Sequence, residues 1–316
     1  MGTLSRFVIQ REDGAEFEIL SGFGCGLNGW RVPNGKGGLE ELLFGYTDEP
    51  TLRAISNDTN AGCRLSPFPG RTCNAKFTWN GKTYQLENNV TWAPHALHGF
   101  LQNKCWQFES FEIVETEIDG KRQQGASATF TCDFPGAYAG FPFPFLATNT
   151  VFFTGESYKV VSSVKNYGSS PMPYSEGFHP YYTLGEKVDG LTMELPESKL
   201  ALCDSADIPT GNFKQDTRFV GGRKIDDEFI NDCFCIHMNG LAHVYLSSST
   251  KKLDIWQQAG NEQYNAIQIY TPPTRENIAI EPMTAEPDAL NHHRGLIVIE
   301  PGKTKTFQFG ATFSCM

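Results

Sequence analysis

Apolar and polar residues alternate along most of this chain in short runs that are typical of β-strands. Clear examples, rich in β-branched and aromatic side chains, are residues 16–20, 127–132, 157–163 and 306–310. Turn-forming pairs separate such runs: Asn80-Gly81, Asp119-Gly120, Asn239-Gly240 and Pro301-Gly302. This spacing predicts roughly 15 to 20 short strands.

The strand pattern predicts an all-β fold, namely a large antiparallel β-sandwich of two packed sheets. We find no convincing amphipathic helix, and the best short candidate covers residues 38–43. No linker, low-complexity segment or repeat divides the chain. We therefore expect a single domain over residues 1–316.

The charge balance narrows the choice of partner. The chain has 36 acidic and 26 basic residues, and its formal net charge is -10. This sign argues against nucleic acid and against an anionic membrane surface, whereas a small neutral molecule is compatible with it. No apolar run is long enough for a signal peptide or a membrane span, so we expect a cytoplasmic protein, monomeric or homodimeric. The nine cysteines show no paired zinc spacing and are expected to be reduced thiols.

One motif resembles a nucleotide site but lacks its context. Gly24-Cys-Gly26-Leu-Asn-Gly29 matches the dinucleotide fingerprint, and a predicted strand precedes it. The fingerprint works only if a helix begins there and its N-terminus receives the pyrophosphate. The next residues are Trp-Arg-Val-Pro-Asn-Gly, which cannot start a sustained helix. We interpret the segment as a glycine-rich turn and expect no cofactor.

Several segments place titratable residues among apolar or turn-forming neighbours: residues 70–74, 94–100, 176–182, 278–291 and, more weakly, 231–235. Taken singly, Arg71 fits a salt bridge, His179 a packed aromatic cluster and Asp232 a turn. His95 and His98 have an i, i+3 spacing, but Pro94 and Gly99 leave no helix that would hold a metal pair. Glu281 lies in a strongly apolar strand, where a carboxylate is costly unless it is paired or functional.

Taken together, these segments resemble the aldose 1-epimerase (galactose mutarotase) family, over about residue 65 to the C-terminus. The matching features are Gly70-Arg71-Thr-Cys-Asn74, Leu97-His98-Gly99, the stretch around His179-Pro-Tyr-Tyr, Asp232 before Phe234, and Glu281 followed by Pro287-Asp288-Ala-Leu-Asn291. The order and spacing of five separated motifs make the resemblance specific. It implies a galactose mutarotase-like supersandwich and a carbohydrate substrate.

The resemblance also implies roles for individual residues. Mutarotation needs a general base at the sugar C1 hydroxyl and a general acid at the ring oxygen, with no metal and no cofactor. Glu281 would be the base, His179 the acid and His98 a second donor near the ring oxygen. Arg71, Asp232 and Asn74 would bind sugar hydroxyls. Candidates for an aromatic cover over the sugar include Trp92, Phe178 and Tyr181.

The sequence departs from the family pattern around His179 and after Glu281, which indicates a divergent subfamily and leaves the preferred sugar open. A hexose-6-phosphate 1-epimerase is one alternative, and it would need a cationic cluster beyond Arg64 and Arg71. A non-catalytic carbohydrate-binding protein on the same fold is another, and it would not need both Glu281 and His179. A polysaccharide lyase would need a tyrosine-based site that the sequence does not show.

Overall fold

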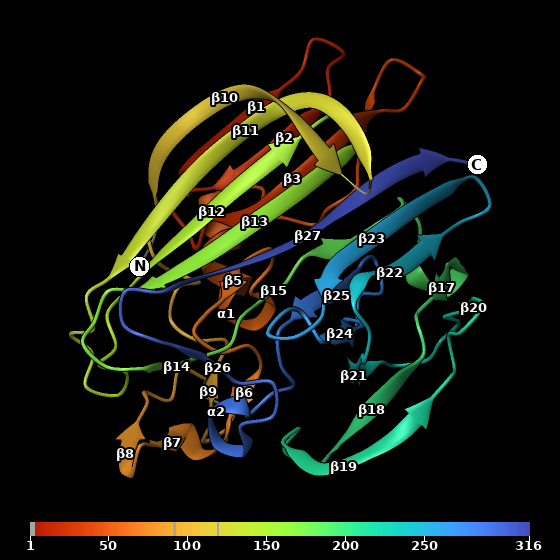
Figure 1. Ribbon diagram of the computed structural model, residues 1–316. Coiled ribbons are helices and arrows are strands. Elements are labelled where there is room, and N and C mark those ends of the chain that lie inside the picture. The colour runs from red at the N-terminus through yellow and green to blue at the C-terminus, as the bar shows by residue number, and fades with distance from the viewer. Residues whose placement is uncertain (1–3, 91–92, 119) are drawn as a thin grey trace.

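The computed structural model describes residues 4–90, 93–118 and 120–316, and three large antiparallel sheets dominate it (Figure 1). The widest sheet has nine strands, in the order β10 (Gln107–Ile118), β11 (Lys121–Phe134), β12 (Phe145–Phe153), β13 (Ser157–Asn166), β27 (Thr304–Cys315), β23 (Lys251–Ala259), β22 (Gly240–Ser247), β17 (Thr192–Glu194) and β20 (Arg223–Lys224). The C-terminal strand β27 thus lies at the centre of this sheet.

Two further sheets pack on the nine-stranded one. The first has four strands: β1 (Arg6–Gln10), β2 (Glu16–Leu20), β3 (Gly26–Pro33) and β4 (Leu39–Glu41). The second has eight strands: β19 (Pro209–Asp216), β18 (Ser198–Cys203), β21 (Asn231–Cys235), β24 (Ala266–Tyr270), β25 (Ile278–Met283), β15 (Gly177–Phe178), β5 (Arg64–Leu65) and β16 (Tyr181–Tyr182), which pairs with β25. Three two-strand pairs complete the described strands: β6 (Arg71–Thr72) with β9 (Ala96–Leu97), β7 (Lys76–Trp79) with β8 (Lys82–Gln85), and β14 (Met172–Tyr174) with β26 (Ile297–Ile299).

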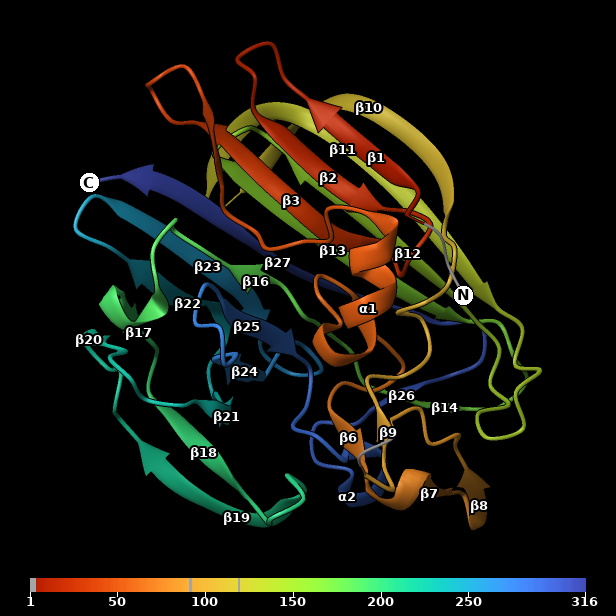
Figure 2. The same ribbon diagram turned by 180° about the vertical axis from the view of Figure 1, so that it is seen from behind.

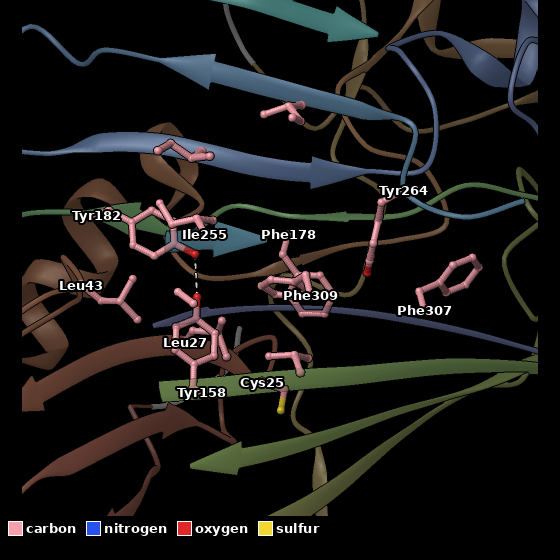
Figure 3. Packing of buried hydrophobic residues seen from close by; sticks show 14 of the residues in the cluster. Cys25, Leu27, Leu43, Tyr158, Phe178, Tyr182, Ile255, Tyr264, Phe307 and Phe309 are labelled. Carbon is pink, nitrogen blue, oxygen red and sulfur yellow. Dashed lines mark hydrogen bonds between the residues drawn. The ribbon is translucent and has the colours of Figure 1, made fainter. Parts of the chain in front are cut away.

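The two smaller sheets share one face of the nine-stranded sheet (Figures 1 and 2). Tyr158 of β13 shows this, because its ring contacts Phe17 of β2 at 5.0 Å while its hydroxyl bonds that of Tyr182 of β16 at 2.6 Å. Further along, Phe178 packs on Phe309 of β27 at 4.7 Å between ring centroids (Figure 3). The predicted all-β antiparallel sandwich is confirmed, but one side of it consists of two sheets, because a twisted sheet of nine strands is too wide for one flat partner.

The predicted turns and helices have mixed outcomes. Asn80 and Gly81 join β7 to β8 with positive φ angles of 47° and 75°, as the sequence predicted. Strand β3, and no helix, follows the glycine-rich turn at Gly24. The helix candidate at residues 38–43 is wrong: strand β4 occupies it.

A helix that the pattern did not predict, α1 (Glu49–Thr59), follows instead, beside the four-stranded sheet (Figure 2). Local chemistry starts and stops it: the Asp48 carboxylate accepts the Thr51 N–H at 2.7 Å, and Asn60 ends it in the left-handed conformation. The other described helices are short: α2 (Ala289–His292) and the 3-10 turns Cys73–Ala75 and Val188–Gly190. No helix among the residues described is long and apolar enough to cross a membrane.

A fully buried ion pair ties the eight-stranded sheet to the nine-stranded sheet. Arg64 Nη2 of β5 lies 2.5 Å from Glu176 Oε2, and neither side chain has exposed surface. Arg64 also donates to the carbonyl oxygens of Thr148 in β12 and Ser163 in β13, both at 3.1 Å. Glu176 accepts hydrogen bonds from the hydroxyl groups of Ser162, Tyr174 and Tyr264. The charges are therefore compensated on both sides, as burial in a medium of low dielectric constant demands.

Removing one partner of this pair should destabilise the fold strongly. We expect Arg64→Met or Glu176→Gln to lower the free energy of unfolding by about 3–5 kcal/mol, because a charge or a set of hydroxyls is left buried without its partner. The double variant should lose less than the sum of the two losses. Urea unfolding of the natural protein, the two single variants and the double variant measures the coupling energy between Arg64 and Glu176. Lys187→Met is the matched control: its pair with Glu276 is 3.7 Å long and mostly exposed, and we expect a loss below about 1 kcal/mol. Additive losses would show that the buried pair is not a coupled unit.

Candidate active site

A pocket of about 400 Å³ opens on the eight-stranded sheet, and it collects residues from distant parts of the chain. Glu281 of β25 lies in its wall, because side chains alternate along a strand: Ile278 and Ile280 face the main core, and Glu281 faces the other way. Gln268 of β24, the cross-strand neighbour of Glu281, lines the pocket beside it.

Glu281 and His179 form a buried pair. Glu281 Oε1 and His179 Nε2 are 3.3 Å apart, and the two residues are 2% and 6% exposed. Two backbone hydrogen bonds hold His179 in place: its N–H donates to the Cys63 carbonyl at 3.1 Å, and its carbonyl accepts the Gly62 N–H at 2.8 Å. The Tyr181 ring stacks on the imidazole at 4.8 Å and also lines the pocket. The imidazole is thus held edge-on to the carboxyl group.

His98 and Arg71 enter the pocket from the β6–β9 pair. His98 has a left-handed backbone with φ 61°, and its Nδ1 accepts the Gly70 N–H at 3.1 Å. The proton of the neutral ring must therefore sit on Nε2, which makes His98 a donor. Its ring meets that of His179 edge-on, with 5.4 Å between centroids. Arg71 Nη2 lies 2.8 Å from Asp207 Oδ2, and both residues line the pocket.

Burial shifts the pKa values of these groups in opposite directions. It raises the pKa of Glu281 well above its usual value, and it lowers the pKa of His179 to about 4. The pKa of His98 also falls well below its usual value, first through burial and then through the nearby His179 and Arg71. Both shifts favour the uncharged forms of the two groups, a carboxylic acid and a neutral imidazole.

The pair retains unused hydrogen-bonding capacity. Within the described part of the chain, the buried atoms Glu281 Oε2 and His179 Nδ1 have no hydrogen-bond partner. A buried polar atom without a partner costs about 1–3 kcal/mol, so such atoms are rare in the interior of a domain. Two such atoms belong to one buried pair that lines the pocket, where the hydroxyl groups of a ligand can bond them.

The Pro287–Asn291 segment packs against the turn at residues 70–74, which carries Arg71. The Asp288 N–H donates to the Arg71 carbonyl at 2.7 Å, and the Asp288 carboxylate accepts the Cys73 N–H at 2.8 Å. Pro287 packs against Gly70, where an added Cβ would lie 2.7 Å from the proline ring. The segment therefore positions Arg71 and the residues that precede it.

Asp232, which the sequence analysis expected to bind sugar, is not among the residues that line the pocket. It occupies β21, where Asn231 and Cys233 line the pocket and the intervening Asp232 points to the opposite face. There its Oδ2 lies 2.6 Å from Arg218 Nη2. Asp207, in the loop between β18 and β19, is a carboxylate that lines the pocket beside Arg71.

Two other candidates also lie away from the pocket. The Asn74 side chain is exposed in the 3-10 turn after Arg71 and does not line the pocket. Phe178 packs in the core against Phe309, so it cannot cover a sugar (Figure 3). Tyr181 does line the pocket, and Trp92 lies outside the described residues. Arg71, His98, His179 and Glu281 are thus brought together, whereas Asp232 and Asn74 are not.

Several residues of the pocket were missed by the sequence analysis: Asn60, Asp207, Asn231, Gln268 and Tyr270. Asn231 had a usable signal, because strand alternation next to the buried Phe234 predicts that Asn231 and Asp232 face opposite ways. Nothing local marks Asp207 or Gln268. No group of three or more His, Cys, Asp or Glu among the described residues could hold a metal ion.

Comparison with known proteins agrees with this geometry. The model of the aldose 1-epimerase family matches residues 5–312. The uncharacterized protein YihR of Escherichia coli (strain K12) is 30% identical over 257 residues, covering 76% of this chain and 74% of its own. The uncharacterized protein YphB of the same strain is 25% identical over 276 residues, covering 78% and 82%.

The fold has solved counterparts. A galactose mutarotase-like protein from Clostridium acetobutylicum superposes with a TM-score of 0.82 at 19% identity, covering 98% of this chain and 95% of that chain. The galactose 1-epimerase from Lactobacillus acidophilus NCFM superposes with a TM-score of 0.78 at 14% identity, covering 98% and 94%. The fold and the site therefore define a galactose mutarotase-like protein. The family match over nearly the whole chain adds that this chain belongs to the aldose 1-epimerase family.

The raised pKa of Glu281 has a consequence for stability. Above the usual carboxyl pKa of 4.5 the unfolded chain releases this proton while the folded chain keeps it, so Glu281 lowers stability as the pH rises. We expect Glu281→Gln to be more stable than the natural protein, by a margin that grows by up to about 1.4 kcal/mol per pH unit from pH 4.5 until the raised pKa is reached. Urea unfolding at a series of pH values measures the margin, and a margin independent of pH would contradict the shift.

Proposed function

We propose that this protein is an aldose 1-epimerase, which interconverts the α and β anomers of a neutral hexose by opening and closing the sugar ring. The observation that carries the proposal is the buried pair of Glu281 and His179, 3.3 Å apart at the wall of a polar pocket. The C1 hydroxyl oxygen and the ring oxygen of a pyranose are both bonded to C1. Two groups this close can therefore each reach one of those oxygens.

Ring opening moves two protons. The Glu281 carboxylate takes the proton of the C1 hydroxyl, and the protonated His179 gives its proton to the ring oxygen. The bond between C1 and the ring oxygen breaks, and the C1 hydroxyl oxygen becomes the aldehyde oxygen. His98, with its proton on Nε2, supplies a further hydrogen bond to the ring oxygen as negative charge develops there.

Burial matches the protonation of the pair to this step. The starting form, carboxylate with imidazolium, and the product form, carboxylic acid with neutral imidazole, hold the same single proton. The opposite pKa shifts of Glu281 and His179 favour the product form. Ring opening therefore replaces a buried charged pair by an uncharged one, and rotation about C1–C2 followed by the reverse transfers closes the ring to the other anomer.

The charge around the pocket favours a neutral sugar. Arg71 is the cation that lines it among the described residues, and Asp207 already neutralises that charge at 2.8 Å. Asp58 adds a second carboxylate to the lining. Arg64, the other arginine that a phosphate site would recruit, is fully buried against Glu176. A hexose phosphate would meet repulsion here, so the phosphorylated substrate is the weaker candidate.

Loss of the acid or the base should slow turnover without abolishing binding. We expect Glu281→Gln and His179→Asn each to lower kcat by roughly 10²- to 10⁴-fold, the usual effect of removing a positioned proton-transfer group. Polarimetry on freshly dissolved α-glucose and α-galactose measures the rate, and calorimetric titration measures the binding of each sugar.

A matched control is available on the nine-stranded sheet. His243 Nδ1 and Asp254 Oδ1 form a histidine–carboxylate pair at 2.8 Å, and neither residue lines the pocket. Asp254→Asn should leave kcat unchanged. Mutarotation that survives intact in Glu281→Gln would contradict the role of Glu281 as the base, and a natural protein that binds sugar without accelerating mutarotation would be a carbohydrate binder.

The two candidate aspartates can be separated directly. We expect Asp207→Ala to raise KM by about tenfold with a smaller effect on kcat, because Arg71 loses the carboxylate that orients it towards the sugar. Asp232→Ala should change neither constant, because its partner Arg218 keeps Asp216 and Glu228. A rise in KM for Asp232→Ala alone would restore the sequence-based assignment.

A further inference from the structure

A second cavity lies next to the catalytic pocket, and the segment from Leu97 to Phe100 forms the wall between them. His98 lines the catalytic pocket, while Gly99 and Phe100 line a cavity of about 300 Å³, here called the second cavity. Because His98 and Phe100 are two positions apart, their Cα atoms are separated by at most about 7 Å. The two spaces are therefore near enough for one extended ligand.

A smaller cavity, here called the passage, borders both of them. It measures about 80 Å³, and it shares Asn60 and Leu97 with the catalytic pocket. It shares Asn89, Gln102 and Asn103 with the second cavity. The three spaces are thus neighbours that share wall residues.

The second cavity has the chemistry of a carbohydrate site. Phe100 stacks on Phe134 at 5.4 Å, and Tyr138 meets Phe100 edge-on at 5.3 Å, so aromatic surface lines one side. Amide side chains line another side, and amides both donate to and accept from hydroxyl groups. Glu87 and Lys104 contribute opposite charges that cancel. An uncharged ligand with apolar faces and hydroxyl edges fits such a lining.

One atom of the passage lacks an internal partner. Gln102 Oε1 is buried and accepts no hydrogen bond within the described part of the chain. A buried acceptor left without a donor is costly, and a ligand hydroxyl would supply the donor.

The walls are also held rigidly. The Asn89 amide bonds both the N–H and the carbonyl of Leu97 at 2.7 Å. The Gly24 N–H donates to the Lys104 carbonyl at 2.8 Å, and a Cβ at Gly24 would lie 2.5 Å from the Gln102 carbonyl oxygen. The glycine-rich turn of the sequence thus packs directly against the segment that lines the second cavity.

We infer that the second cavity is a subsite for a second, neutral sugar ring, and that the preferred substrate is a reducing disaccharide. This inference rests on the proposed function for the catalytic pocket. The reducing-end ring lies against Glu281 and His179, the glycosidic linkage lies beside Gln102 and Asn103, and the second ring lies against Phe100 and Tyr138. Ring opening occurs only at the reducing end, so the proton transfers are unchanged.

The test compares maltose and gentiobiose, which carry 1→4 and 1→6 linkages, with glucose. Polarimetry should give a kcat/KM for at least one disaccharide about tenfold above that for glucose. Gln102→Leu combined with Asn103→Ala should remove this advantage and leave the glucose value unchanged. Gln258→Leu, on β23 and outside the three spaces, is the matched control.

Calorimetric titration of Glu281→Gln separates this inference from the proposed function. Tighter binding of a disaccharide than of glucose, lost in the Gln102 and Asn103 variant, supports the subsite even if no sugar is turned over. Rapid mutarotation of glucose with no disaccharide advantage in kcat/KM or affinity would overturn the subsite and leave the proposed function standing. Binding of every sugar without turnover would instead overturn the proposed function.

Discussion

The interaction on which the rest of the structure depends is the buried ion pair between Arg64 and Glu176. A charge between two sheets is tolerated only with full compensation, so the segments that carry these residues have little freedom to move. Glu176 is three residues before His179, and Thr284 is three residues after Glu281. The backbones of these two residues are joined by hydrogen bonds. The Glu176 N–H donates to the Thr284 hydroxyl at 2.9 Å, and the Thr284 N–H donates to the Glu176 carbonyl at 2.8 Å. One buried residue thus links strand β25, which carries Glu281, to the segment between β15 and β16, which carries His179.

The same burial sets the chemistry of that pair. Glu281 and His179 are nearly as inaccessible as Arg64 and Glu176. Both oxygens of Glu176 accept hydrogen bonds, and Arg64 Nε is the buried atom of that pair without a partner. In the second pair a carboxylate oxygen and an imidazole nitrogen lack partners, and both residues line the pocket. Desolvation moves the pKa values of Glu281 and His179 in opposite directions, towards the uncharged form of each group.

The motif residues have different places around the pocket. Arg71, His98, His179 and Glu281 line it, whereas Asp288 and Asn291 hold the turn that carries Arg71. The Asp288 carboxylate accepts the Cys73 N–H, and the Asn291 amide donates to Asp288 at 2.7 Å. Asp207, in the loop between β18 and β19, also lines the pocket. Motif residues therefore mark the neighbourhood of the pocket, and only some of them line it.

The sequence by itself determined the strand-rich fold, the hairpin turn at Asn80-Gly81, the family, and the candidates Arg71, His98, His179 and Glu281 that the pocket brings together. These follow from local periodicity, turn chemistry and motif spacing. Only the tertiary structure decided that Asp232 faces Arg218 and that Asp207 lines the pocket. It also decided that two separate sheets pack on the nine-stranded sheet. A shift of one residue in a strand reverses the face of every side chain, and the β18–β19 hairpin meets Arg71 across more than a hundred positions of chain. Such pairings, like the burial that raises the pKa of Glu281, arise from packing between segments that the sequence does not place next to one another.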